Sequence, residues 1–211
     1  MRILTGVLAM AIVVVASNIL VQFLLGQWLT WGALTYPIAF LVTDVMNRVY
    51  GPAAARKVVF AGFLVGVACS LIGSQIMLEG GGYSYPAVAL RVAVGSGIAF
   101  LAAQLLDVAL FDALRQGRWW LPPLVSTIVG SAADTALFFS IAFSEQITVF
   151  GPEADAAINW AWESVPFLGF GETLPLWVSL GFADWLVKLS LALLALVPFR
   201  MLVTKLSPDV G

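Results

Sequence analysis

Five ionisable side chains interrupt stretches of sequence that are otherwise apolar. They are Asp44, Asp107, Asp134, Asp184 and Lys188. Such a residue near the centre of a membrane-spanning helix costs about 2.5–3.5 kcal/mol on insertion scales, so five cost roughly 15 kcal/mol before any compensation. A chain that only packs helices together would not need these charges. We therefore expect them to bind one another or a ligand.

The residues around three of the aspartates recur at steps of three and four, which places them on one face of a helix. The three stripes are Thr127, Gly130, Ser131, Asp134 and Phe138; Phe100, Gln104, Asp107 and Phe111; and Tyr36, Phe40, Thr43, Asp44 and Asn47. Each stripe combines an aromatic ring, a hydrogen-bonding group and a carboxylate. Polar stripes in a membrane face protein or water rather than lipid. Facing one another, they would line a small-molecule site with flat apolar walls and a few polar groups.

The lysine has more than one possible partner. Asp184 and Lys188 are four residues apart and can neutralise each other as a structural pair, or Lys188 can pair with Asp134 or Asp107 across the bundle. Trp185, next to Asp184, can stack on a planar ligand.

Asp44 and Arg48 have the same spacing of four and can form a second structural pair. Gly62 and Gly66 form a G-x-x-x-G motif, which is typical of close helix packing.

Composition identifies an integral membrane protein, because 61% of the 211 residues are hydrophobic and only 10% are charged. About 20 apolar residues cross a bilayer as a helix, and an open sheet cannot satisfy its backbone there. We predict an all-α single transmembrane domain over 1–211 with six membrane-spanning helices. Their ranges are about 3–25, 29–47, 58–78, 88–111, 121–143 and 176–199. The first is too long for a signal peptide's apolar region, and no A-x-A site follows it.

The basic residues predict the orientation. Eight of the ten lie on one side if both termini are cytoplasmic, as the positive-inside bias requires: Arg2, Arg48, Arg56, Lys57, Arg115, Arg118, Arg200 and Lys205. The opposite loops carry the acidic residues Glu79, Glu145, Glu153, Asp155, Glu163 and Glu172.

The longest loop, 144–175, contains Pro152 followed by acidic residues, which indicates a helix start. We predict a short interfacial helix on the outer surface between the fifth and sixth spans. A lid over an outward-facing cavity is the alternative. An inverted repeat of three plus three spans is also open.

Several classes of function are excluded or disfavoured. A net charge of −2 does not indicate a nucleic-acid partner, and a single cysteine cannot form a disulfide within the chain. There is no His for a His-based metal site or proton relay, and no P-loop sequence for ATP hydrolysis. We expect no cofactor and no metal.

Three segments resemble the queuosine-precursor transporters of the vitamin uptake transporter family, which are similar to the substrate-binding components of energy-coupling-factor importers. The segments are "YPIAFLVTDVMNRVYG", "AQLLDVALFDALRQGRWWLPPLVSTIVGSAADTALFFSIAF" and "FADWLVKLSLALLALVP". The specific pattern is T-D, Q-x-x-D, S-T…D-T and a lysine, in that order. The resemblance directs attention to Thr43, Asp44, Gln104, Asp107, Ser126, Thr127, Asp134 and Lys188. Where this chain reads N-R-V-Y-G, the family often has an acidic residue in place of Arg48, so no carboxylate role transfers there.

The resemblance implies a six-helix inner-membrane importer of 7-deazaguanine bases such as preQ0 and preQ1, and no enzyme. Such a base offers adjacent N–H donors and an acceptor oxygen on its Watson–Crick edge, which a carboxylate and a Gln, Ser or Thr can answer. Asp134 is our principal candidate for the carboxylate. A transporter of another planar vitamin or nucleobase, an aspartate-dependent membrane enzyme and a packing subunit are the alternatives. The driving force, an energising partner and homo-oligomerisation stay open.

Overall fold

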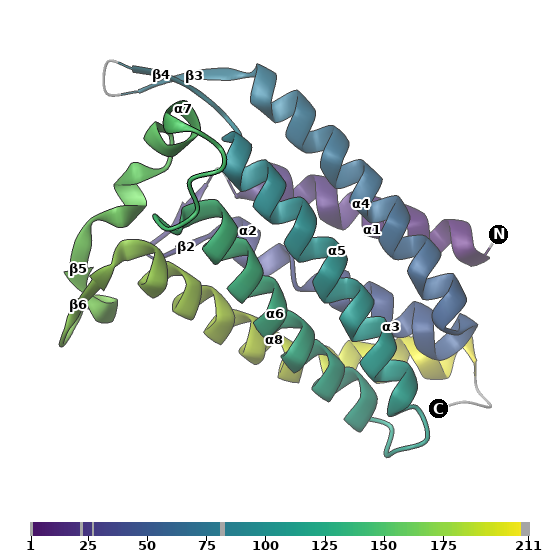
Figure 1. Cartoon of the computed structure of the whole chain (residues 1–211). Helices are drawn as coiled ribbons and strands as arrows, with labels where there is room; N and C mark the ends of the chain where they lie inside the picture. The colour runs from purple at the N-terminus through teal and green to yellow at the C-terminus, as the bar shows by residue number, and fades with distance from the viewer. Residues whose placement is uncertain (1, 22, 27, 81–82, 208–211) are drawn as a thin grey trace.

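The computed structural model describes residues 2–21, 23–26, 28–80 and 83–207. Five helices in this described part are long and apolar enough to cross a membrane: α1 (Arg2–Leu20), α4 (Pro52–Gln75), α5 (Leu90–Ala113), α6 (Leu121–Phe143) and α8 (Leu176–Leu206). They pack side by side in one bundle (Figure 1). The all-α membrane class predicted from composition is therefore confirmed.

The predicted span at 29–47 consists of two helices rather than one. They are α2 (Trp31–Thr35) and α3 (Ile38–Tyr50), which begins directly after Pro37. Proline has no backbone N–H and its ring clashes with the preceding turn, so an apolar run breaks there. Neither helix alone reaches the length that a bilayer requires. A sixth crossing built from α2 and α3 together stays a prediction.

Three predicted boundaries differ from the structure. Helix α1 ends at Leu20, and β1 (Leu24–Leu25) and β2 (Leu29–Thr30) follow as an antiparallel pair. Helix α4 begins at Pro52 instead of 58, because Gly51 adopts φ +85 and proline is favoured in a first turn. Helix α8 runs on past Pro198 to Leu206.

Short elements close one end of the bundle. They comprise the hairpin of β3 (Met77–Gly80) and β4 (Tyr83–Pro86), helix α7 (Pro152–Ala156), the 3-10 helices η1 (Asn159–Trp162) and η2 (Phe167–Gly169), and the pair of β5 (Ser164–Pro166) with β6 (Thr173–Pro175). Helix α7 begins at the proline that predicted it. Trp162 fixes this segment to α6 by donating from Nε1 to the carbonyl of Phe143 at 2.7 Å.

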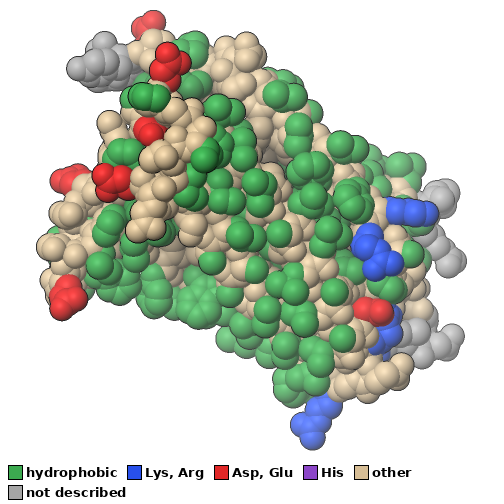
Figure 2. Space-filling model, viewed as in Figure 1, with side chains coloured by type: hydrophobic (Ala, Val, Ile, Leu, Met, Phe, Trp, Pro, Cys, Tyr) green, Lys and Arg blue, Asp and Glu red, His purple; other side chains and the backbone are tan. Residues whose placement is uncertain are grey.

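The two ends of the bundle differ in charge. Both termini and the loop from α5 to α6 lie at one end, and the β3–β4 and β5–β6 pairs lie at the other (Figure 1). Figure 2 shows Lys and Arg side chains at the first end, which we call the basic end, and Asp and Glu side chains at the second, the acidic end. Hydrophobic side chains cover the surface between the two ends (Figure 2). Leu64, Leu193 and Met201 are among the exposed apolar residues.

Apolar packing surrounds a polar centre. One buried cluster, which includes Met10, Val58 and Phe100, joins α1, α3, α4 and α5. A second joins α6 to η1 through Phe143 and Ala161. Between them, the inward faces of α3, α5, α6 and α8 carry the polar residues described next.

Candidate functional site

The three predicted polar stripes converge in the interior. Their polar members, together with Ser126 and Lys188, are all buried: Thr43, Asp44, Asn47, Gln104, Asp107, Ser126, Thr127, Ser131, Asp134 and Lys188. They come from α3, α5, α6 and α8, so residues up to 145 positions apart in the sequence meet in one region. The prediction that these faces point inward is correct.

Lys188 organises one part of this region, which we call the lysine cluster. Its Nζ lies 2.7 Å from Asp134 Oδ2 and 2.5 Å from Asp184 Oδ2, and donates to Thr135 Oγ1 at 3.0 Å. Tyr36 donates from its hydroxyl to Asp134 Oδ1 at 3.0 Å. Of the three partners considered for the lysine, Asp184 on its own helix and Asp134 across the bundle are engaged together, and Asp107 is not among its ion pairs in the described part of the chain.

The lysine cluster leaves Asp134 little capacity to accept further hydrogen bonds. One carboxylate oxygen accepts from Tyr36 and the other from Lys188. An ammonium group has three donors, and those of Lys188 meet three partners here. These contacts connect α6 and α8 to Tyr36, which lies between α2 and α3.

Asp44 and Asp107 form a second group, the carboxylate pair. Asp44 accepts hydrogen bonds from Ser126 Oγ at 3.3 Å and from Thr127 Oγ1 at 3.1 Å. Asp107 lies beside Asp44 and Ser126, but neither of its oxygens makes a well-formed hydrogen bond among the described residues. Two like charges beside each other in a protein interior repel, which disfavours the state in which both are ionised. The pair is therefore a high-energy arrangement unless something compensates its charge.

Gln104 extends the carboxylate pair by one turn of α5. Its Oε1 accepts from Thr43 Oγ1 at 2.5 Å, whereas its Nε2 has no hydrogen-bond partner among the described residues. Gln104 and Asp107 are three positions apart on one helix face. Together they present one unpartnered donor and two unpartnered acceptors, all buried. Buried polar groups are normally paired, so this set is available to bind water or a polar ligand.

Asn47 and Arg48 lie at the basic end of this region and take no part in the carboxylate pair. Arg115 donates to the Asn47 carbonyl at 2.8 Å and to its Oδ1 at 2.5 Å. Arg48 donates to the Arg115 carbonyl at 3.0 Å. The predicted ion pair of Asp44 with Arg48 is not among the ion pairs of the described residues. Arg48 instead links α3 to the loop after α5.

The remaining candidates have lesser or different contacts. Ser131 donates back to the Ile128 carbonyl of its own helix at 3.1 Å. Phe40 packs over Gly130, where an added Cβ would lie only 3.0 Å from its ring and 3.3 Å from the Cβ of Asp107. Trp185 has a buried Nε1 without a partner among the described residues.

The polar centre is closed in this structure. A cavity of about 10 Å³ between α3, α6 and α8 touches Asp44 and Thr127. Another of about 30 Å³ lies between α1, α4 and α5 and touches Tyr36. Typical ligand sites enclose about 300–1,000 Å³. Neither of these two cavities can hold a small organic ligand unless the helices around it move apart.

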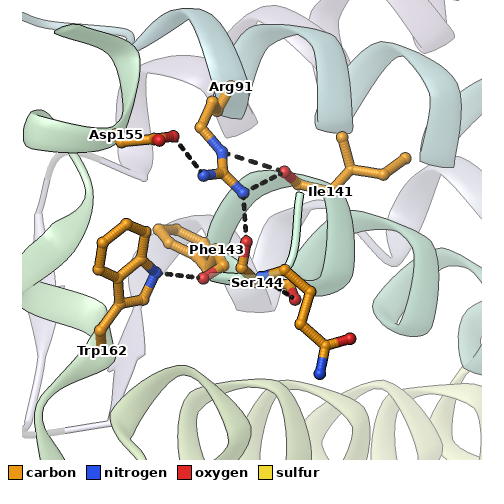
Figure 3. A network of polar contacts seen from close by, with 7 residues as sticks. Arg91, Ile141, Phe143, Ser144, Asp155 and Trp162 are labelled. Atoms are coloured by element: carbon orange, nitrogen blue, oxygen red, sulfur yellow. Dashed lines mark hydrogen bonds and ion pairs between the residues drawn. The ribbon is translucent and has the colours of Figure 1, made fainter. Parts of the chain in front are cut away.

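Arg91 builds a further buried network at the acidic end, which Figure 3 shows. It donates to Asp155 Oδ1 at 2.6 Å and to the carbonyls of Ser144 at 2.6 Å and Ile141 at 3.2 Å. Its side chain is fully buried and lies over the Phe150 ring. These contacts fasten the segment after α6 to the start of α5.

Sequence reasoning missed the roles of Arg91, Arg115 and Thr135. The residue pattern gave one usable signal, because Thr135 directly follows Asp134 in the D-T motif. The two arginines were counted only as loop charges. Among the described residues, no group of three or more His, Cys, Asp or Glu is placed to hold a metal ion.

The fold and this interior define a class: a multi-pass α-helical membrane protein with a closed, charged centre suited to a small polar molecule. A family model described as "Putative vitamin uptake transporter" matches residues 30–203, and the chain belongs to this family.

Three similar proteins have names that refer to queuosine precursor transport. The chain is 37% identical to the "Queuosine precursor transporter" of Escherichia coli (strain K12) over 159 residues, which are 71% of this chain and 70% of the relative. It is 34% identical to the "Probable queuosine precursor transporter" of Haemophilus influenzae over 176 residues, 80% of this chain and 66% of the relative. A protein of the same name from Bacillus subtilis (strain 168) is 35% identical over 134 residues, 57% of this chain and 58% of the relative. No solved structure matches.

Proposed function

We propose that this protein imports 7-deazaguanine precursors of queuosine, such as preQ0 and preQ1, across the bacterial inner membrane. Relatives at 34–37% identity are named as queuosine precursor transporters. They are transporters rather than enzymes, and they support a small planar base as the substrate class. The basic end would face the cytoplasm, because basic residues favour that side. Six crossings, with α2 and α3 together forming the second, would put both termini there.

The unpartnered atoms of Gln104 and Asp107 carry the proposal for substrate recognition. The Watson–Crick edge of a deazaguanine presents, in order, an acceptor oxygen, a ring N–H and an exocyclic amine. The amide Nε2 of Gln104 would donate to the oxygen, and the two oxygens of Asp107 would accept from the two nitrogens. The protein's donor–acceptor–acceptor row is thus complementary to the base's acceptor–donor–donor row.

Neighbouring residues would complete the site. Phe40, which packs beside Asp107 at Gly130, would stack on the base, and Thr43 would hold the Gln104 amide in its orientation through the 2.5 Å hydrogen bond. Trp185 stays a candidate for stacking on a base that contacts Asp134. Asp134 stays a second candidate for contact with the base. We place Asp107 first because both oxygens of Asp134 are already engaged.

The test compares Asp107→Asn with Asp134→Asn and with Asp112→Asn, an exposed carboxylate on the same helix as Asp107. Asn replaces one acceptor of Asp107 by a donor that faces the donors of the base, which costs at least about 2 kcal/mol, or roughly thirtyfold in affinity. Asp107→Asn should lose preQ0 and preQ1 binding in a thermal-shift titration, and uptake into vesicles, with little loss of stability, because it removes one of two adjacent like charges. Asp134→Asn should lower stability. Asp112→Asn should behave like the parent.

A base analogue checks the orientation. A 7-deazahypoxanthine lacks only the exocyclic amine and should bind about tenfold more weakly than the 7-deazaguanine, since one hydrogen bond is lost. The recognition proposal is wrong if both bases bind equally or if Asp107→Asn transports at the parent rate. Binding of guanine or an unrelated vitamin in preference to preQ0 and preQ1 would overturn the substrate class.

A further inference from the structure

We propose that the Asp44–Asp107 carboxylate pair binds the proton that drives transport, and that Asp44 carries this proton while Asp107 holds the base. The inference rests on the proposed import of a 7-deazaguanine and adds the coupling ion. It makes the protein a proton symporter rather than a facilitator.

Burial and charge at the pair carry the argument. Asp44 is 3% exposed and Asp107 is fully buried. They lie side by side on α3 and α5. No ion pair joins either carboxylate to a Lys or Arg within 2–21, 23–26, 28–80 and 83–207. Two adjacent buried carboxylates cannot both stay charged without a cation, and sharing a proton is the usual solution.

Among the described residues, the elements packed around the pair supply no Lys or Arg that could neutralise it in place of a proton. Helix α6 supplies the hydroxyls of Ser126 and Thr127. Helices α1 and α4 contribute apolar packing such as Met10 and Val58, and α8 contributes Leu191 and its neighbours. The cations on these and adjoining elements bond elsewhere: Arg48 to the Arg115 carbonyl, Arg115 to Asn47, Lys188 to Asp134 and Asp184, and Arg200 over the Trp119 ring.

Coupling follows from the proximity of the two carboxylates. Asp107 must be ionised to accept the two N–H groups of the base. With Asp107 charged, the proton that the two carboxylates share is confined to Asp44, which relieves the repulsion. The base therefore binds the form of the pair that carries one proton, and any effect of this proton on base affinity is matched by an equal effect of the base on proton affinity. No bond of the base changes: the proton adds to the Asp44 carboxylate on one side of the membrane and leaves it on the other.

Asp44 also borders a small cavity on the side toward the basic end. The cavity of about 10 Å³ that touches Asp44 is bounded by Pro123, in the first turn of α6, and by Phe199 late in α8. Its volume is about that of one water molecule. Asp44 therefore borders a water-sized space on the side toward the basic end, and Phe40 also lines it.

The experiment uses the full chain in proteoliposomes, with the membrane potential clamped at zero and labelled preQ0 as the probe. PreQ0 is uncharged, so pH does not change its own charge. An outside one pH unit more acidic should accumulate preQ0 about tenfold, the ratio that one proton per neutral base implies. Asp44→Asn should slow preQ0 exchange several-fold and reduce the accumulation ratio to about one. Asp112→Asn should keep the parent's ratio.

The outcomes separate the two proposals. Parent protein that exchanges preQ0 but accumulates it equally with and without the pH gradient overturns the proton site, as does an Asp44→Asn variant that keeps the tenfold ratio. A parent that neither binds nor exchanges preQ0 contradicts the proposed function instead. Should Asp44→Asn fail to fold, proton movement by the parent decides: about one proton entering the vesicle lumen per preQ0 imported, followed with an internal pH dye, supports the site, and none overturns it.

Discussion

Lys188 on α8 lies 2.7 Å from Asp134 on α6, and both side chains are only 4% exposed. The same ammonium group also contacts Asp184 at 2.5 Å. One cation therefore neutralises carboxylates from two helices in a region from which water is largely excluded. Removing one partner of such a pair leaves an uncompensated buried charge, which costs far more than the pair itself contributes.

Lys188→Met should be the most destabilising change in the lysine cluster, by about 3–5 kcal/mol. It leaves both Asp134 and Asp184 without their cation. Asp184→Asn should cost much less, because Lys188 keeps Asp134 and Thr135 and because Asp184 is 15% exposed. The double variant Asp184→Asn, Lys188→Met should retain more folded protein than Lys188→Met alone. Melting temperatures of detergent-purified protein measure this.

Lys205→Met, an exposed lysine on the same helix, is the control and should melt like the parent. Equal losses for Asp184→Asn and Lys188→Met would contradict the description of Lys188 as a shared counter-ion.

Arg91→Met should loosen the segment that follows α6. The change removes the donors to Asp155, Ser144 and Ile141 together, so amide hydrogen exchange across 144–158 should accelerate and the melting temperature should fall. Arg91→Lys should restore little, since one ammonium cannot reproduce the planar fork of a guanidinium. Asp155→Asn should be milder, because both carbonyl contacts remain. Unchanged exchange in Arg91→Met would show that other contacts hold the segment.

The two glycines of the G-x-x-x-G motif should respond differently to alanine. A Cβ at Gly62 would lie 2.5 Å from the Cγ of Met10 and 3.2 Å from the Phe100 ring, whereas a Cβ at Gly66 would lie 3.6 Å from Val14. Overpacking typically costs about 1–3 kcal/mol. Gly62→Ala should lower the melting temperature, and Gly66→Ala should leave it equal or higher because alanine favours helix. Similar effects at both positions would refute the α1–α4 packing described here.

Cysteine labelling tests the proposed orientation, in a Cys69→Ala background. A membrane-impermeant reagent applied to intact cells should modify Ala156→Cys at the acidic end but not Gln116→Cys at the basic end. Both positions are exposed, so access depends only on the side of the membrane. Two other loop positions are less suitable for cysteine labelling: Ala54 is buried, and residue 81 lies outside the described residues. Labelling of Gln116→Cys from outside would invert the topology.

Much of the architecture follows from local properties of the sequence. The long apolar runs require helices, because only a helix satisfies its own backbone in lipid. The three- and four-residue spacing of Gln104 with Asp107, and of Thr127 with Asp134, fixes which faces turn inward. Pro37 and Pro198 show the limit of this reasoning: α3 begins directly after the first, whereas α8 continues through the second, whose lost hydrogen bond is tolerated.

Only the tertiary structure decides which of the buried charged side chains contact one another. Asp134, Asp107 and Asp44 look alike in the sequence, each a carboxylate in an apolar helix. Yet Asp134 meets Lys188 from α8, while Asp107 meets Asp44 from α3 and has no well-formed hydrogen bond to any residue that the structure describes. The four-residue spacing allows an ion pair between Asp44 and Arg48, but Arg48 donates a hydrogen bond to the Arg115 carbonyl instead. Periodicity defines the direction of a side chain on its own helix, whereas the depth and rotation at which helices pack decide which charges meet and which stay unpaired.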